Sequence, residues 1–294
     1  MDSFKELAVN PDTYSQLENF VSRPAQGLLI IGPAGAGKKA VAKQLAAALL
    51  STKPDKLAIH RSFFRVSVLE GKKDISIDSA RQLIKDLNLR VPGEERAINR
   101  VALVQDAENL SAEAQNALLK LLEEPPRSSL LILTSSAPQQ LLPTVVSRLQ
   151  KLNVKPVSLQ LAFEFFGKDF GRAEIESAWR LSRGSAGLMS TLLAEGQEHE
   201  LKQAVEDAKR LLALRKYDRL IFLQQASKDK NRFAKLLDGL SRVLAVLHQN
   251  RLSAGKPSTE LLSARKCILQ TIEAVDKNAN ARLVALNLAL DITV

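Results

Sequence analysis

The stretch Gly32-Pro33-Ala34-Gly35-Ala36-Gly37-Lys38-Lys39 is a glycine-rich turn between an apolar run and an alanine-rich run. It follows the P-loop pattern G-x-x-x-x-G-K-[ST], in which backbone amides cradle phosphates, the lysine reaches the terminal phosphates and the last hydroxyl binds magnesium. Lys39 stands at the hydroxyl position, and an ammonium has no lone pair to give to a cation. The turn therefore predicts a degenerate nucleotide-binding site, poorly equipped for metal-assisted hydrolysis, that is formed by Gly32, Gly35, Gly37, Lys38 and Lys39.

The segments around this turn indicate a P-loop fold. Apolar Leu28–Ile31 predicts a buried strand before it, and 40–50 predicts a helix after it, which is the order that the motif requires. The alternative is a glycine turn that opens an ordinary helix in another kind of α/β domain. Strand-like and helix-like segments then alternate, as in a mostly parallel sheet with helices on both faces: strands at 62–68, 101–104 and 130–134, and helices at 77–87 and from the cap residue Ser111 to Pro125.

The alternation ends near Lys155-Pro156, and from Leu159 onward the segments have helical period. One apolar stripe runs from Phe233 to Leu247, and a break at 183–187 separates a small helical segment from the rest. We therefore expect three domains, at 1–155, 156–195 and 196–294.

A second nucleotide-site element is expected where the strand at 101–104 ends. P-loop enzymes place an acidic pair there, which organises magnesium and positions water. This chain has Gln105 followed by Asp106, and an amide is a weak, uncharged metal ligand. This defect affects the same ion as Lys39 does, so we assign no metal ligands, regard magnesium as a poor fit and leave ATP or ADP as the candidate ligand.

Composition limits the classes of partner and compartment. The 294 residues carry 42 basic and 32 acidic side chains, and the net charge of +10 favours an acidic partner such as nucleic acid. Aromatic residues make up only 4%, which favours contact with the DNA backbone over base stacking. A single cysteine excludes an intrachain disulfide and a multi-cysteine zinc site. The start lacks a secretory leader and no apolar run approaches membrane length, so we expect a cytoplasmic protein without a membrane partner. Basic residues are densest at Lys56, Arg61, Arg65, Lys72, Lys73, Arg81, Lys85, Arg90, Arg96 and Arg100.

Two long blocks carry a family resemblance. Asn116-Ala117-Leu118-Leu119-Lys120-Leu121-Leu122-Glu123-Glu124-Pro125-Pro126 and the segment from Thr134 to Arg148 resemble the AAA+ subunits of the bacterial sliding-clamp loader. The region 63–89 and the degenerate metal site are more similar to the delta-prime than to the gamma/tau subunits of DNA polymerase III. The resemblance implies an α/β P-loop AAA+ domain, a small helical lid domain and an all-α C-terminal collar that serves oligomerisation.

The resemblance also assigns roles to single residues. Ser147-Arg148 matches the Ser-Arg-Cys motif, with Leu149 in place of cysteine, and its arginine acts as a finger in the ATP site of a neighbouring subunit. A guanidinium supplied in trans stabilises charge on the transferring phosphoryl group, which fits this assignment. Ser135 or Ser136 falls at the position that senses the terminal phosphate, and Thr134 is an alternative alignment for it. Active subunits have a second sensor, an arginine, where this chain has Gly187, so this contact of a working ATPase is missing. Arg183 is the candidate for a partial substitute.

The leading hypothesis from the sequence is a delta-prime-like clamp-loader subunit that lacks its own ATPase activity and supplies Arg148 to a neighbour. Its implied partners are the gamma/tau and delta subunits, the sliding clamp and, through the complex, primer-template DNA. Two alternatives stay open. One is an active gamma/tau-like ATPase in which Asp106 and Glu108 recruit magnesium, and the other is a stand-alone nucleic-acid-binding module that uses the basic region.

Overall fold

The structure is a computed structural model that describes residues 4–69, 71–72, 74–88, 97–194, 200–256 and 258–292. These residues form two compact units. The first contains the described residues up to Arg172 together with Gly184–Leu188, and the second contains Ala173–Arg183 and the residues from Met189 onward. These two units do not test the predicted domain boundaries at 156 and 196, which stay a prediction.

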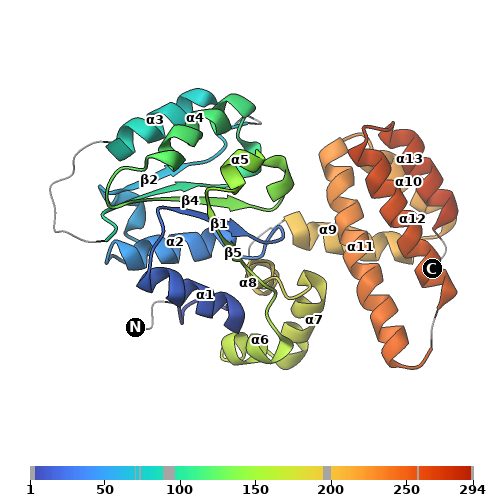
Figure 1. The fold of residues 1–294 in the computed structure, drawn as a ribbon. Coiled ribbons are helices and arrows are strands. Elements are labelled where there is room, and N and C mark those ends of the chain that lie inside the picture. The colour runs from blue at the N-terminus through green and yellow to red at the C-terminus, as the bar shows by residue number, and fades with distance from the viewer. Residues whose placement is uncertain are drawn as a thin grey trace. The chain divides into compact units, whose positions relative to one another are not determined.

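A parallel sheet organises the first unit (Figure 1). Its five strands lie in the order β2-β3-β4-β1-β5, so β1, which leads into the glycine turn, lies between β4 and β5. Every strand pair is parallel, which confirms the predicted α/β class. The strands are β1 (Gly27–Ile31), β2 (Phe63–Val66), β3 (Arg100–Val104), β4 (Ser129–Ser135) and β5 (Gln150–Asn153).

Helices cover both faces of the sheet, with α1 and α2 on one face and α3, α4 and α5 on the other (Figure 1). Alternation along β1 explains how both layers are held, because Leu28 and Ile30 pack into the core on the α1 and α2 side while Leu29 packs on the opposite side. All three side chains are fully buried. The helices of this unit are α1 (Pro11–Ser22), α2 (Lys38–Leu49), α3 (Ile77–Asn88), α4 (Ala112–Glu123), α5 (Pro143–Val146) and α6 (Leu159–Phe166).

The sequence predicted the central strands more closely than the edges of the sheet. β2 covers only Phe63–Val66 of the predicted segment 62–68, and α2 begins at Lys38, two residues before the predicted start. β5 (Gln150–Asn153) was not predicted, since its side chains are polar and exposed except for the buried Leu152. Ser111 does cap α4, because its hydroxyl accepts a hydrogen bond from the Ala114 amide at 3.2 Å.

The second unit is helical throughout its described residues, as the sequence predicts. The long helix α11 packs against α9 and α12, while α13 packs against α10 and α12. The apolar stripe of α11 is buried from Phe233 to Leu244, but Leu247 is 38% exposed, so the predicted stripe extends too far. The remaining helices of the chain are α7 (Arg172–Ser182), α8 (Ala186–Leu193), α9 (Glu200–Ala213), α10 (Lys216–Ala226), α11 (Lys230–Ser253), α12 (Thr259–Asp276) and α13 (Ala281–Asp291).

Among the residues that the structure describes, no helix combines the length and the apolar character needed to cross a membrane.

Candidate functional site

The glycine turn joins the end of β1 to the start of α2, as a P-loop does. Gly35 and Gly37 have positive φ angles of 76° and 92°, a conformation that favours glycine. Gly32 is closely packed, because a methyl group added to it would lie 3.1 Å from the carbonyl oxygen of Val154. The backbone thus explains why each of the three glycines is needed.

Lys38 is held by its own chain. Its Nζ donates to the carbonyl oxygens of Gly32 at 2.8 Å and Pro33 at 2.9 Å, and to the Ser136 hydroxyl at 2.8 Å. The residue is 5% exposed. Burial lowers the pKa of Lys38, and the carboxylates of Glu108 and Asp106 act in the opposite direction. These three hydrogen bonds use all the donors of an ammonium, so none is left over for a phosphate.

Lys39 forms an ion pair with Asp106, with Nζ and Oδ2 2.6 Å apart. Asp106 follows the end of β3 in a left-handed conformation with φ of 52°, and its amide donates to the Thr134 hydroxyl at 3.0 Å. The Lys39 ammonium thus neutralises the Asp106 carboxylate, the group that would otherwise bind magnesium. Gln105 is buried at 7% exposure, and its amide continues the sheet by donating to the Val66 carbonyl at 2.9 Å.

Glu108 completes a charge-neutral cluster with Lys38, Lys39 and Asp106. Its Oε1 accepts a hydrogen bond from the Ser136 amide at 3.0 Å, while its Oε2 is buried without a hydrogen-bond partner among the described residues. The two carboxylates thus balance the charges of the two lysines within the cluster.

The two predicted phosphate-sensing serines have different environments. Ser136 contacts both Lys38 and Glu108, so it belongs to the charged cluster. Ser135 is fully buried at the end of β4, and its hydroxyl accepts a hydrogen bond from the Ala137 amide at 3.1 Å. The geometry therefore favours Ser136 over Ser135 as the residue next to Lys38, while the sensing role itself stays a prediction.

The segment 184–188 lies directly against the glycine turn. The Leu188 amide donates to the Gly35 carbonyl at 3.0 Å. A methyl group on Gly187 would lie 2.6 Å from the Gly35 oxygen and 3.2 Å from the Gly37 nitrogen, and one on Gly35 would lie 2.1 Å from the Leu188 side chain. The 184–188 segment therefore packs on the turn whose amides cradle phosphate in working P-loops.

Replacing Gly187 with alanine is expected to destabilise the first unit by about 1–3 kcal/mol, because the new methyl group meets backbone atoms that cannot rotate away. Urea unfolding of the full chain measures this cost. At an uncrowded helix position the same change is stabilising by roughly 0.5–1 kcal/mol. A gain in stability would therefore contradict the close packing of Gly187 on the turn.

Arg148 follows the short helix α5 and is held by two contacts. Its Nη1 donates to the Thr144 carbonyl at 2.8 Å, and its Nη2 lies 2.7 Å from the Glu123 carboxylate. The side chain remains 36% exposed, so it is accessible from outside the chain. Neither contact belongs to the glycine turn, which agrees with a guanidinium that serves another molecule.

Arg183 makes a side-chain contact within the second unit, where its Nη2 donates to the Ser241 hydroxyl of α11 at 3.2 Å. Partial burial lowers the pKa of Arg183, and the nearby Arg242 adds to this effect. The backbone has a positive φ of 55°. Its role as a second sensor stays a prediction.

Two of the described residues of the basic region, Arg100 and Arg81, have partners within the chain. Arg100 donates to the carbonyl oxygens of Leu87 and Arg127, which connects β3 to neighbouring segments. Arg81 lies 3.9 Å from Asp78. Lys73, Arg90 and Arg96 lie outside the described residues. In the described ranges, no group of three or more His, Cys, Asp and Glu side chains is placed to hold a metal ion.

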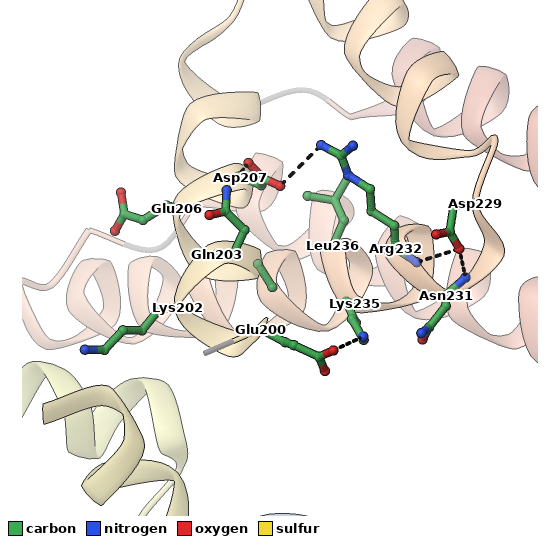
Figure 2. A pocket seen from close by; sticks show the side chains of 11 residues that line it. Glu200, Lys202, Gln203, Glu206, Asp207, Asp229, Asn231, Arg232, Lys235 and Leu236 are labelled. Carbon is green, nitrogen blue, oxygen red and sulfur yellow. Dashed lines mark hydrogen bonds and ion pairs between the residues drawn. The ribbon is translucent and has the colours of Figure 1, made fainter. Parts of the chain in front are cut away.

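A pocket of about 600 Å³ lies between α9 and α11 in the second unit (Figure 2). Two ion pairs lie among its lining side chains: Lys235 lies 2.5 Å from Glu200, and Arg232 lies 4.0 Å from Asp207. None of the residues that the sequence singles out for function lines it. The pocket therefore adds nothing to the nucleotide or arginine assignment.

A family model described as "DNA polymerase III, delta subunit" matches residues 9–158, more than half of the chain. The chain belongs to this family. The match covers the glycine turn, the Lys39–Asp106 pair and Arg148, so the whole charged cluster lies inside the region that defines the family.

Curated relatives in this family are delta-prime subunits. The chain is 31% identical over 205 residues to DNA polymerase III subunit delta' of Pseudomonas aeruginosa, covering 64% of this chain and 62% of the relative. It is 32% identical over 132 residues to the Escherichia coli delta' subunit, covering 44% and 38%. The matched stretches thus span less than two thirds of these relatives. Delta-prime similarity is confirmed, while the activity of the whole protein is left to proposal.

Two further comparisons connect the delta-prime family with the gamma/tau type. The Bacillus subtilis tau subunit is 30% identical over 143 residues, which is 45% of this chain and 25% of that protein. A gamma subunit-related protein from Thermotoga maritima has the same fold, with a TM-score of 0.59 at 20% identity over 95% of this chain and 98% of that one. These comparisons confirm the predicted AAA+ fold class with a helical C-terminal region.

Proposed function

We propose that this chain is the delta-prime subunit of a DNA polymerase III clamp loader, that it does not hydrolyse ATP, and that it supplies Arg148 to the ATP site of a neighbouring subunit. Family membership supports the assignment to the complex. The observation that carries the mechanistic part is the 2.6 Å ion pair between Lys39 and Asp106.

The ion pair supports an inactive site for an electrostatic reason. Phosphoryl transfer in P-loop enzymes depends on a magnesium ion held by the hydroxyl after the P-loop lysine and by an acidic side chain. Here a lysine replaces the hydroxyl and neutralises Asp106, the nearest acidic ligand. A divalent cation placed there would lie beside the Lys39 ammonium, which repels it. The active gamma/tau-like alternative requires both obstacles to be removed.

Lys38, the lysine of the turn, is also poorly available to a phosphate, for a reason that is independent of the Lys39–Asp106 ion pair. Lys38 uses its three donors within the chain, and the Gly187 and Leu188 backbone lies against Gly35. Binding a polyphosphate would require Lys38 to exchange these bonds and the 184–188 segment to move. These contacts support a turn that takes up a polyphosphate poorly.

Arg148 supplies the part of the chemistry that this chain can still perform. A guanidinium stabilises charge that develops on a transferring phosphoryl group, and it can do so from a neighbouring protein. Arg148 is partly exposed and is held at the end of α5 without contact to the chain's own turn. This placement supports a role in trans.

Exposed leucines in the second unit support assembly with other subunits. On α13, Leu283, Leu286 and Leu290 are 60%, 43% and 50% exposed, and their spacing puts them on one face. On the neighbouring helix α12, Leu262 and Leu269 are 57% and 58% exposed. Repeated exposure of large apolar side chains marks an interaction surface. We assign this surface to the gamma/tau and delta partners.

The remaining partners follow from the complex. Within it the chain would act on the sliding clamp and on primer-template DNA, in the cytoplasm. Copurification from the native host followed by native mass spectrometry tests this assignment. Recovery with gamma/tau and delta subunits is expected, and recovery of the chain without either of them would contradict the proposal.

A hydrolysis assay on the purified full chain tests the inactive site. We expect phosphate release with magnesium and ATP to stay at background, and we expect Lys38→Ala to leave it unchanged. The tau-like alternative makes the opposite prediction, namely magnesium-dependent turnover that Lys38→Ala abolishes. Observing that turnover would overturn the proposal for the Lys39–Asp106 pair.

A further inference from the structure

The family block at 116–126 contains two adjacent acidic side chains, Glu123 and Glu124, whose place is not explained by packing. Its apolar residues are core, since Leu118 and Leu121 of α4 are buried between the helix and the sheet. Glu123 is the last residue of the same helix, and its side chain is 52% exposed. Packing therefore accounts for the leucines of the block and leaves Glu123 without a role in the core.

Glu123 makes a direct contact with the proposed arginine finger. Its Oε1 accepts a hydrogen bond from Nη2 of Arg148 at 2.7 Å, while Nη1 of the same guanidinium donates to the Thr144 carbonyl at 2.8 Å. A guanidinium is planar, so two contacts at different nitrogen atoms fix both its position and its orientation. The carboxylate and the α5 carbonyl together hold the arginine.

The contact leaves the guanidinium able to bind a second anion. Arginine carries five N–H donors in a rigid fork, and the two contacts of Arg148 use two of them. The remaining donors can meet the phosphate oxygens of a neighbouring nucleotide without breaking the Glu123 contact. Holding the arginine and using it are therefore compatible.

Stability alone does not account for this ion pair. Both partners are well exposed, at 36% for Arg148 and 52% for Glu123. Exposed pairs contribute little to the free energy of unfolding, because water screens the charges and ordering two long side chains costs entropy. The main effect of such a pair is to orient the guanidinium, and its orientation matters most in the transition state of phosphoryl transfer.

We infer that Glu123 is a positioning residue for Arg148, which orients the guanidinium toward the ATP of the neighbouring subunit. The inference rests on the proposed function, because it requires Arg148 to act in trans. Glu123 acts through Arg148 and has no contact of its own with the reacting phosphate.

The test uses the clamp-loader complex reconstituted with its native partner subunits and measures DNA-stimulated ATP hydrolysis under single-turnover conditions. We expect Glu123→Ala to lower the hydrolysis rate at the facing site by about tenfold to a hundredfold, as expected for a misplaced catalytic group. The KM for ATP should stay unchanged, since the arginine acts on the transferring group. Glu123→Gln should restore much of the rate, because its carbonyl oxygen still accepts the hydrogen bond from Nη2.

Glu124→Ala is the matched control, since it removes the same charge from the next residue of the block and should leave the rate unchanged. In the Arg148→Ala background, Glu123→Ala should have no further effect, because a positioning residue acts only through the group that it positions. Urea unfolding of each variant chain should match that of the unmodified chain.

The outcomes separate this inference from the function on which it rests. If Arg148→Ala leaves hydrolysis unchanged, the proposed finger is wrong. If Arg148→Ala slows hydrolysis and Glu123→Ala does not, the positioning role alone is overturned. A faster rate in Glu123→Ala would also overturn it, because it would show that the carboxylate holds the arginine back.

Discussion

Replacing Arg148 with alanine is expected to slow ATP hydrolysis at the facing site of the neighbouring subunit by about 10³-fold, the lower end of the range for arginine fingers. The physical reason is the loss of a fixed positive charge beside oxygens that become more negative in the transition state. Folding should be unaffected, since the side chain is partly exposed and its ion pair with Glu123 lies at the surface.

The measurement is single-turnover hydrolysis by the reconstituted complex, together with the rate of clamp loading onto primed DNA. Arg23→Ala provides a matched control, because Arg23 is an exposed arginine of the same unit that lies outside the motifs. Arg148→Lys should give an intermediate rate, since an ammonium keeps the charge and loses the planar fork. Equal rates for Arg148→Ala and Arg23→Ala would exclude the finger.

The loss of two metal-binding side chains could be read from the sequence because it depends on local chemistry. Lys39 follows a recognisable turn, and Gln105-Asp106 follows a recognisable strand. Parallel strands that end at the same edge of a sheet bring such residues together. Even the Lys39–Asp106 contact is therefore predictable in principle from the sequence. We predicted the loss of magnesium ligands but not that the two changes would neutralise each other.

The packing of Gly187 against the glycine turn could not be predicted in the same way. Gly187 is about 150 residues from Gly35 in sequence, and the close approach depends on how the chain returns to the sheet after α7. From the sequence alone, Gly187 is only a glycine at the position where the family resemblance leads us to expect an arginine. The reason for a glycine became visible when its neighbours, the backbone atoms of Gly35 and Gly37, were located.

The edge strand of the sheet and the end of the apolar stripe on α11 are also difficult to predict from the sequence. β5 has one buried residue, Leu152, among polar ones, so neither alternation nor an apolar run marks it as a strand. It forms because β1 offers a free edge for pairing. Periodicity predicts that the apolar stripe of α11 reaches Leu247, which is partly exposed. It shows which residues share a helix face but not where the neighbouring helix ends.

Replacing both Leu283 and Leu290 with aspartate is expected to weaken assembly with the partner subunits by about a hundredfold or more. The two side chains are 60% and 50% exposed in the described chain, so charges there leave the core intact. In a complex that buries the α13 face, each would have to be dehydrated against apolar neighbours, and interface anchors cost about 2 kcal/mol or more when they are lost.

Assembly at defined concentrations, followed by native mass spectrometry, measures this effect, and circular dichroism of the separate chain verifies its helices. Leu69→Asp is the matched control, since Leu69 is 65% exposed but belongs to the first unit. Loss of assembly in the α13 variant, with normal assembly in Leu69→Asp, would locate the interface on the second unit. The proposed finger requires a bound neighbour, so the α13 variant should also lose finger activity at concentrations that keep the unmodified complex intact. Full assembly by the α13 variant would mean that the exposed leucines of α13 are not the contact surface and that the subunits associate through another face.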